Sequence, residues 1–358
     1  MVMRTSLIVD LQKFVQNIRK VKARIPEGVK LLAVVKADAY GHGAVALSNI
    51  AHEEGVDYFG VATAAEAIEL REAGIRTPIL LLGEPTDWER IKSVIYYDIT
   101  LMVYSEEFLA ELLKVSESYK KKVKVHLKVD TGMTRLGVKA DDVVAFAKKI
   151  LANPFLELEG VATHLADSDN EDVSYSKKQV EIFERVIFEL SKEGIDIPIK
   201  HASNSAGIIN PISPFFDMVR AGIDLYKGIM SFTAKVLYVR EIEPGEHVGY
   251  CLTYKSEQKM RIAVISVGYA DGYSRALSNK GRVLLHGVAC PIVGNICMDM
   301  MMVAIPVDLE VKVGDDAVLI GSQDGEEITV NEIAQLIGTI EYEVMTSIGK
   351  RVARIYRS

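Results

Sequence analysis

A lysine at the end of an apolar run has a clear capacity for chemistry. Five apolar residues, Leu31–Val35, lead directly into Lys36 and the segment Ala-Asp-Ala-Tyr-Gly-His-Gly. Burial beside such a run disfavours the ammonium form and lowers the pKa of the amine, which can then attack an aldehyde. The alternative is a solvated lysine whose stem lies along the apolar surface. Alone, Lys36 fits the alternative better, so its context decides.

Other cationic and polar side chains also follow apolar runs. One run contains Lys128 and is followed by Arg135, and the next run ends at His164. Ion pairs with nearby acids and an ordinary structural histidine would explain each of these residues alone. Two later segments combine small residues with exposed amides, Asn204–Gly207 and Arg220–Ile223. Backbone N–H groups in such segments can bind a phosphate, and simple turn formation is the alternative.

Two other kinds of site are disfavoured. The segment Gly41–Ala46 follows a strand-like run and matches a loose dinucleotide fingerprint. Asp57, however, begins the next strand-like run, whereas a ribose-binding acid belongs at its end. The seven histidines are scattered, and the three cysteines contain no Cys-x-x-Cys pair. We therefore expect neither a nicotinamide enzyme nor a required metal.

The elements that must position these residues form an alternating series. Short apolar runs alternate with stretches that have apolar spacings of three and four, which is typical of βα units and a parallel sheet. We predict eight strands, at Leu31–Val35, Tyr58–Val61, Pro78–Leu82, Thr100–Val103, Val123–Val129, Leu158–Thr163, Ile197–Ala202 and Met218–Ile223. We predict intervening helices that include Ala64–Ala73, Glu106–Val115, Asp141–Leu151 and Lys177–Leu190. Eight such units indicate an α/β fold with a TIM-type (β/α)8 barrel.

The character of the sequence changes after Gly228. Short strands separated by turn residues are predicted at Met260–Val267, Val283–Leu285, Ala289–Ile292, Met300–Ile305 and Ala317–Ile320. Only Asn331–Ile337 is predicted to be helical in this part. We therefore expect a barrel domain over residues 8–228 and a mostly β C-terminal domain over residues 229–358, with residues 1–7 as a candidate addition to the second.

The overall composition excludes several classes of protein. The 358 residues carry a formal net charge of −7, which argues against a nucleic-acid-binding surface. No uninterrupted apolar run is long enough to cross a bilayer, so we expect no membrane helix. The cysteines do not form a disulfide pattern, which fits a reducing compartment and a cytoplasmic protein.

Together, these segments resemble alanine racemase, a family of pyridoxal-phosphate enzymes built from a TIM-like barrel and a C-terminal β domain. The most specific match is Ala33–Gly43, which is similar to the family's cofactor-lysine signature. Further matches follow in order along nearly the whole chain, at His126–Met133, Asn204-Ser205, Arg220–Ile223, Gly268–Gly272, Cys297–Asp299 and Tyr342–Val344.

The resemblance implies a role for each site residue. Lys36 would carry pyridoxal 5'-phosphate as a Schiff base and act as one catalytic base, with Tyr250 as the second base on the opposite face. The other cofactor-binding residues that it implies are Tyr40, His164, Asn204, Ser205, Arg220, Gly222, Ile223 and Tyr342. The substrate-binding residues that it implies are Arg135, Tyr269 and Met298, and Lys128 is a candidate for carbamylation.

The resemblance also implies a homodimer that converts L-alanine to D-alanine and back, the latter for peptidoglycan. In this family the residues matched by Tyr250 and Met298 reach the active site from a second subunit. One alternative is a racemase of broader or serine specificity on the same fold. Another is a non-catalytic pyridoxal-phosphate carrier, but such carriers are single-domain proteins, and the C-terminal domain with Tyr250 disfavours that interpretation.

The chain departs from the family pattern at three places. Thr134 precedes Arg135 where a glycine is usual, and Lys227 follows Tyr226 where glycine usually follows directly. The segment Gly249–Cys251 replaces the commoner Ser-Tyr-Gly. The last change matters most because it flanks the implied second base.

Overall fold

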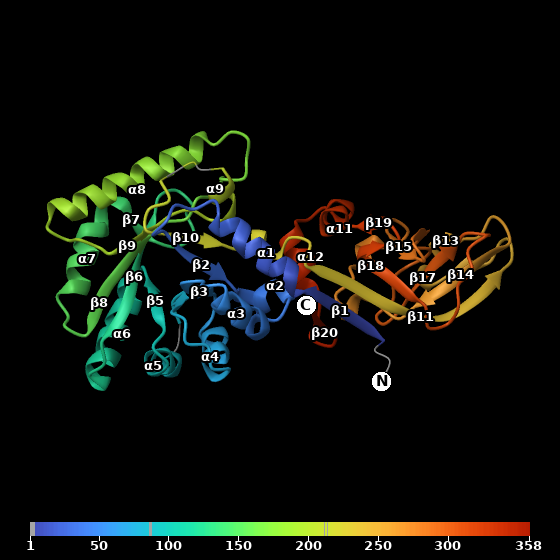
Figure 1. The fold of residues 1–358 in the computed structure, drawn as a ribbon, viewed down its shortest axis with the longest axis horizontal. Coiled ribbons are helices and arrows are strands. Elements are labelled where there is room, and N and C mark those ends of the chain that lie inside the picture. The colour runs from blue at the N-terminus through green and yellow to red at the C-terminus, as the bar shows by residue number, and fades with distance from the viewer. Residues whose placement is uncertain (1–3, 86–87, 211, 213) are drawn as a thin grey trace. The chain divides into compact units, whose positions relative to one another are not determined.

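Two compact units make up the chain in the computed structural model, which describes residues 4–85, 88–210, 212 and 214–358 (Figure 1). One unit, here named the barrel unit, contains Val15–Ala39 and Ala44–Leu225. The other, here named the β unit, contains residues 4–14, Tyr40–Gly43 and Tyr226–Ser358. Residues 8–14 and Tyr40–Gly43, which the sequence places in the barrel domain, thus group with the β unit. Of residues 1–7, the first three lie outside the described residues.

Eight parallel strands form the sheet of the barrel unit. In sheet order they are β10 (Met218–Ala221), β2 (Lys30–Val34), β3 (Tyr58–Val61), β4 (Ile79–Leu81), β5 (Thr100–Val103), β6 (Val123–Asp130), β8 (Leu156–Ala162) and β9 (Ile199–His201). A short strand, β7 (Val138–Lys139), pairs with β6. Between β9 and β10, the backbone N–H groups of Asp217 and Arg220 donate to the carbonyls of Lys200 and Ser203, both at 3.0 Å. The nearly closed barrel confirms the predicted TIM-type fold.

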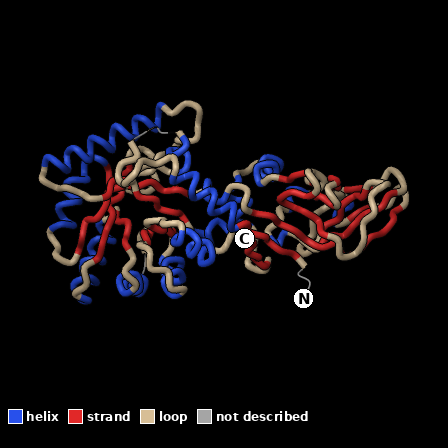
Figure 2. The backbone as a smooth tube through the Cα atoms, in the orientation of Figure 1, coloured by secondary structure: helices blue, strands red, loops and turns tan. Residues whose placement is uncertain are grey.

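Helices lie outside these strands (Figure 2). They are α3 (Ala44–Glu53), α4 (Ala64–Glu72), α5 (Trp88–Tyr96), α6 (Glu106–Tyr119), α7 (Val143–Leu151) and α8 (Ser174–Lys192), with short helices α9 (Ser205–Ile209) and α10 (Ile223–Tyr226) after the last two strands. The helix α1 (Leu11–Lys22) precedes the first barrel strand. In α6, the apolar spacing buries Phe108, Leu112 and Val115, and the Ser105 side chain caps the first turn. All four helices named from the sequence are present.

The β unit contains a second nine-stranded sheet. It consists of β16 (Val288–Pro291), β15 (Arg282–Leu285), β18 (Asp316–Gln323), β11 (Met230–Ile242), β1 (Thr5–Asp10) and β20 (Ala353–Arg357), with β14 (Met260–Ile265), β17 (Met301–Ile305) and β19 (Glu326–Ile328) attached. A separate two-stranded ribbon pairs β12 (His247–Val248) with β13 (Tyr254–Lys255). The five strands predicted here are confirmed, whereas β11, which pairs with β1, β14 and β18, was not predicted.

One helix prediction in the β unit is wrong. The predicted Asn331–Ile337 corresponds to α11 (Val330–Ile337), but a further helix, α12 (Glu341–Ser347), follows it. This helix has seven residues and no side-chain cap at Ile340, and it buries only Val344 and Met345. Its two buried positions are too few to produce a clear helical period in the sequence.

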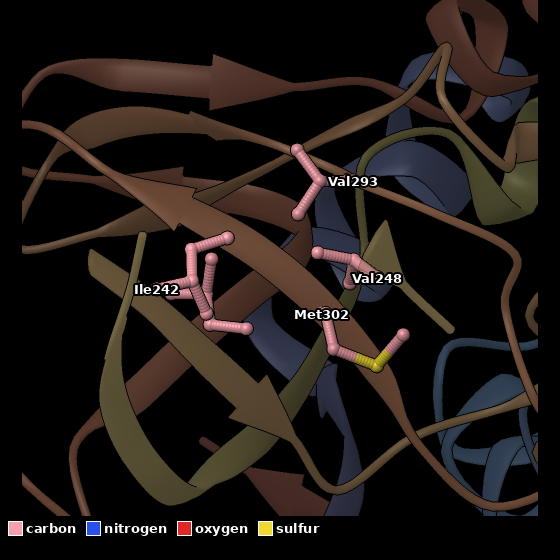
Figure 3. Packing of buried hydrophobic residues seen from close by; sticks show 5 residues of the cluster. Ile242, Val248, Val293 and Met302 are labelled. Atoms are coloured by element: carbon pink, nitrogen blue, oxygen red, sulfur yellow. The ribbon is translucent and has the colours of Figure 1, made fainter. Parts of the chain in front are cut away.

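A small apolar cluster supports the segment that carries Tyr250 (Figure 3). It consists of the buried side chains of Ile242, Val248, Ile262, Val293 and Met302. Val248 lies two residues before Tyr250, so the cluster fixes the start of this segment. Met302 belongs to this cluster, where a flexible thioether side chain can adapt to its neighbours. In the described residues, no helix is long and apolar enough to span a membrane.

Candidate active site

Lys36 begins the short helix α2 (Lys36–Gly41), separated by one residue from the carboxyl end of β2. The side chain is half-buried. Burial lowers the pKa of its amine, repulsion from Arg135 lowers this pKa further, and the carboxylate of Glu66 opposes the shift. A larger share of neutral amine therefore exists at a given pH than for a solvated lysine, which is the condition for a nucleophile or a base.

The backbone after Lys36 is strained. Four successive non-glycine residues have positive φ between 52° and 55°, namely Ala37, Asp38, Ala39 and Tyr40. This left-handed conformation costs roughly 1–2 kcal/mol per residue. Glu66 helps to hold it, because its Oε1 accepts the Ala37 N–H at 2.7 Å while Oε2 accepts N–H groups at the start of α4. Strain that is held by tertiary contacts in this way is typical of functional sites.

Arg220 and His164 lie together at the carboxyl ends of the barrel strands. The Arg220 Nη2 atom donates to the carbonyls of Thr163 and Ala202 at 2.8 and 2.7 Å. It also lies 3.1 Å from His164 Nδ1. Burial lowers the pKa of Arg220 to about 10, so the residue remains a cation at neutral pH. Burial and the Arg220 charge hold the pKa of His164 well below its usual range, so His164 is a neutral acceptor.

Lys128 lies near the carboxyl end of β6, close to the positive charges of Arg220 and Arg135. Burial holds the pKa of its amine well below the usual range, and the charges of Arg220 and Arg135 act in the same direction. Asp130 partly offsets them. In the loop that leads to Arg135, the Asp130 Oδ1 atom accepts the N–H groups of Gly132 at 2.9 Å and Thr134 at 3.0 Å. The Arg135 side chain is exposed at this rim.

Four of the residues expected to bind the cofactor come together after β9 and β10. Asn204 caps α9, because its Oδ1 accepts the Gly207 N–H at 3.0 Å. The buried Ser205 begins α9, and its Oγ accepts the Gly222 N–H at 2.8 Å. Ile223 is the first residue of α10. The starts of α9 and α10 therefore lie side by side, and because the first-turn amides of a helix have no partner within the helix, this arrangement is suited to an anionic group.

The remaining predicted residues belong to the β unit, where they form two groups. The rings of Tyr40 and Tyr342 lie 5.9 Å apart, and Tyr40 also stacks on Tyr226 at 4.7 Å. Burial raises the pKa of Tyr40. The second group consists of Tyr250, Tyr269 and Met298.

Residues 295–298 hold the second group together. The Asn295 side chain donates to the Tyr250 carbonyl at 2.8 Å, and the Tyr269 N–H donates to the Cys297 carbonyl at 3.1 Å. A Cβ on Gly268 would lie 2.3 Å from the Met298 carbonyl oxygen, so this approach requires glycine. The side chains themselves remain exposed, at 72% for Tyr250, 43% for Tyr269 and 53% for Met298.

Two of the three departures from the family pattern place a non-glycine residue in the left-handed region. Thr134 has φ 53° and Cys251 has φ 60°, at the positions where glycine is usual. At the third departure Lys227 has no positive φ, and the left-handed residue is Gly228 at 65°. The first two changes therefore add backbone strain, and the third only shifts the glycine by one position.

Sequence-based reasoning missed three buried polar residues, His126, Glu159 and His201. Each is at most 6% exposed, and together they form hydrogen bonds inside the barrel. A signal was present in β6, where Lys124, His126 and Lys128 occupy every second position of an otherwise apolar strand. Such alternation indicates one polar face of the strand. Among the described residues, no group of three or more His, Cys, Asp or Glu side chains is arranged to hold a metal ion.

Comparison with known proteins agrees with this geometry. Residues 9–229 match the family "Alanine racemase, N-terminal domain", and residues 229–356 match "Alanine racemase, C-terminal domain". The chain is 41% identical to alanine racemase 1 of Oceanobacillus iheyensis, over 97% of this chain and 96% of that protein. It is 40% identical to the alanine racemase of Halothermothrix orenii, over 98% of this chain and 96% of that protein.

Solved structures give the same result. The alanine racemase of Clostridium difficile 630 superposes with a TM-score of 0.94 at 37% identity, covering 100% of this chain and 96% of that one. The alanine racemase of Bartonella henselae with covalently bound pyridoxal phosphate superposes with a TM-score of 0.88 at 30% identity, covering 99% and 100%. The chain therefore belongs to the alanine racemase family.

Proposed function

We propose that the protein interconverts L- and D-alanine with pyridoxal 5'-phosphate and two catalytic bases, Lys36 and Tyr250. The observation that carries this proposal is the half-buried Lys36, whose pKa is lowered at the carboxyl end of the barrel strands. This end of a TIM-type barrel is where active sites occur. Membership of the alanine racemase family over both domains supports the substrate.

The described residues fit the cofactor. Lys36 offers an amine that can bond to an aldehyde, and Arg220, which donates to the Thr163 and Ala202 carbonyls, would supply a cation for the pyridine nitrogen. The Ser205 hydroxyl and the Ile223 N–H offer donors for the phosphate, the Gly222 N–H, which donates to Ser205 Oγ, lies beside them, and Asn204 fixes the helix that starts at Ser205. By the same resemblance, Tyr40 and Tyr342 bind the phosphate and His164 supports Arg220.

The reaction requires control of one proton. When bound, pyridoxal phosphate conjugates the substrate nitrogen to its ring and thereby acidifies the α-hydrogen. Lys36 removes the proton from one face and Tyr250 delivers a proton to the other, and the two residues exchange these tasks in the reverse direction. Arg220 does not readily give up its proton, so beside the pyridine nitrogen it would disfavour transamination.

Lys128 is suited to carbamylation. Burial and the charges of Arg220 and Arg135 hold the pKa of its amine well below the usual range, which raises the share of neutral amine at a given pH. A neutral amine can attack carbon dioxide, with formation of an N–C bond and loss of the N–H proton to solvent. The resulting carbamate is an anion in a place that disfavours a cation, and it would pair with Arg135 beside the substrate.

A homodimer completes the proposed site. Tyr250, Tyr269 and Met298 are exposed on the β unit, and we assign Tyr250 and Met298 to the active site of a second subunit. Tyr269 and Arg135 then contribute to substrate binding. A monomer would lack one of the two bases, so dissociation should abolish racemisation. We place the enzyme in the cytoplasm, where D-alanine is needed for peptidoglycan.

One experiment tests the assignment. The purified protein is scanned for the visible absorbance of the bound cofactor, reduced with borohydride, digested and examined by mass spectrometry. We expect the label on Lys36, and we expect L-alanine to yield D-alanine. If the reduced cofactor is found on a lysine but no amino acid is racemised, the result would support a carrier. If L-serine is racemised faster than L-alanine in a panel of amino acids, the result would support the alternative specificity. Absence of label on Lys36 would refute the proposal.

A further inference from the structure

We propose that Glu159 and His126 are positioning residues, which act through His201 as a directional hydrogen-bond relay that orients Arg220 and stabilises its charge. The relay lies wholly inside the barrel unit. It deepens the proposed function, because it gives the cation at the cofactor a defined support. None of the three residues is expected to touch the cofactor or the substrate.

The relay is continuous. Arg220 Nη1 lies 2.8 Å from His201 Nδ1, and His201 Nε2 lies 2.8 Å from His126 Nδ1. His126 Nε2 lies 3.2 Å from Glu159 Oε2. The second oxygen of Glu159 accepts a hydrogen bond from Lys124. Both histidines are 0% exposed, so no solvent molecule replaces a broken link.

The chemistry of the donors fixes the direction of every link. Arginine has donors only, so His201 Nδ1 must accept, and a neutral His201 then carries its proton on Nε2. His201 Nε2–H donates to His126 Nδ1, which leaves the His126 proton on Nε2. That proton is donated to the Glu159 carboxylate, which has only acceptors. Reversal of either ring would break two hydrogen bonds in a buried place.

The charges agree with this assignment. Burial holds the pKa of His201 well below its usual range and lowers the pKa of His126, so both rings are neutral. Burial opposes the charge of Glu159, but hydrogen bonds from His126 and Lys124 bring its pKa to about 2. A carboxylate and a guanidinium thus occupy the two ends of a chain of two neutral rings. Hydrogen bonds that point the same way polarise one another in a low-dielectric interior.

The barrel has a local adaptation to the relay. His126 lies on β6 and His201 on β9, and β8 lies between these strands. Gly160 of β8 is the register partner of His126, next to an irregularity in the pairing of β6 with β8. A Cβ on Gly160 would lie 2.4 Å from His126 Nδ1. Only glycine therefore lets the two rings meet across the intervening strand.

Stability alone is a weak reason for this arrangement. Burial of polar and charged groups costs free energy unless every group is paired, and apolar side chains of similar volume are often as stabilising. Four such residues, Glu159, His126, His201 and Arg220, occupy the barrel interior in one connected row that ends at the proposed cofactor site. Their arrangement is explained if the row orients Arg220.

The first test needs no cofactor and observes the relay in the wild-type protein. Apoprotein labelled with ¹⁵N-histidine is examined by NMR at pH 7 to 8, with signals assigned from single-histidine variants. We expect His126 and His201 to be neutral Nε2–H tautomers. An Nδ1–H tautomer or an imidazolium at His201 would overturn the relay. Wild-type protein without racemase activity would refute the proposed function instead, while these tautomers would be unaffected.

The second test compares two carboxylates of β8. Glu159→Gln keeps the size and an acceptor for His126 but removes the charge. Glu157→Gln is the matched control, because Glu157 lies on the same strand and pairs with Lys122 at 3.3 Å at the surface. We expect Glu159→Gln to lower kcat about tenfold and to shift the absorbance of the bound cofactor, with KM within about twofold of wild type. Glu157→Gln should change neither property.

A double substitution tests whether the residues act as one row. His126→Asn removes a different link, so Glu159→Gln should have little further effect on kcat when it is added to His126→Asn. Effects that simply multiply would contradict a relay, as would an unchanged kcat and spectrum in a folded Glu159→Gln protein. If Glu159→Gln does not fold, the tautomers in wild-type apoprotein still decide the question.

Discussion

The two units present their predicted site residues in opposite ways. In the barrel unit, Arg220 and His164 are fixed by hydrogen bonds and their pKa values are lowered, mainly by burial. In the β unit, the Tyr250 side chain is 72% exposed and that of Met298 is 53% exposed. The barrel unit therefore holds groups that are already organised, whereas the β unit offers groups whose surroundings another chain can complete.

The site residues of the two units therefore reach their catalytic surroundings in different ways. The pKa of a buried group is shifted by the surrounding fold of its own chain, and the free-energy cost of burying that group is included in the free energy of folding. An exposed group such as Tyr250 makes few contacts in its own chain, and in the proposed homodimer the second subunit completes its surroundings. The comparison therefore predicts that changes in the barrel unit alter cofactor binding and stability, and that changes around Tyr250 alter turnover with the cofactor still bound.

The largest effect is expected from Lys36→Ala in the barrel unit. The substitution removes the cofactor tether and one base, so turnover should fall by at least about 10⁴-fold and the visible absorbance should be lost. Absorbance and D-alanine formation are measured on the same preparation. Lys30→Ala, at the other end of β2, is the control and should keep both. Retained absorbance at the cofactor wavelength in Lys36→Ala would break the assignment.

Tyr250→Phe should affect turnover without loss of the cofactor. It removes a proton donor that we place on one face of the substrate, so we expect a fall of roughly 10²- to 10⁴-fold with unchanged absorbance. Exchange of the α-hydrogen with solvent deuterium should persist for one enantiomer and stop for the other. Tyr238→Phe, a substitution of an exposed tyrosine on β11, is the matched control. Normal racemisation in both directions by Tyr250→Phe would refute the two-base mechanism.

Because the barrel unit contains buried histidines, we expect its free energy of unfolding to fall at acid pH. The pKa values of His126, His164 and His201 are lowered in the folded protein, so the unfolded chain binds protons first as the pH falls below about 6.5. The stability contributed by neutral rings is complete above this pH and is lost below it, by about 1.4 kcal/mol per pH unit for each histidine. Urea unfolding of the apoprotein from pH 7.5 to 5.5 measures the slope. A flat profile would show that these rings are not kept neutral by folding.

Much of this organisation could be predicted from the sequence because it is local. The apolar run before Lys36 predicts β2. The alternation of apolar runs with amphipathic stretches predicts the other barrel strands and places Ser205 and Gly222 after the last two of them. The left-handed turn at Ala37–Tyr40 could not be predicted, since it depends on Glu66 from a different βα unit.

The parts that were missed depend on contacts between distant segments. The pairing of His126 with His201 exists only after the barrel closes and only because Gly160 has no side chain. The strand β11 was missed although residues 230–236 alternate between buried and half-buried positions. Its partner strands are β1, β14 and β18, none of which is joined to it by a short hairpin turn, so the sequence next to β11 contains no turn motif that predicts a strand.

The smallest expected effect concerns the strain added where this chain lacks a glycine. Thr134 has φ 53° in the loop before Arg135, and a β-branched residue is disfavoured there. Asparagine tolerates this conformation and costs less unfolded-chain entropy than glycine, so Thr134→Asn should raise the free energy of unfolding by about 0.5–1 kcal/mol. Thr134→Val keeps the branch and the strain, and it should bring no gain.

The β unit contains a similarly strained position at Cys251. Cys251 has φ 60° and directly follows Tyr250, so Cys251→Gly should relieve a similar strain in the β unit. If strain there helps to place Tyr250, Cys251→Gly should change kcat by a few fold, whereas Thr134→Asn should change stability with kcat nearly constant. Denaturant unfolding and steady-state kinetics on both variants separate these effects. Equal changes in kcat for the two variants would show that the units do not differ in this respect.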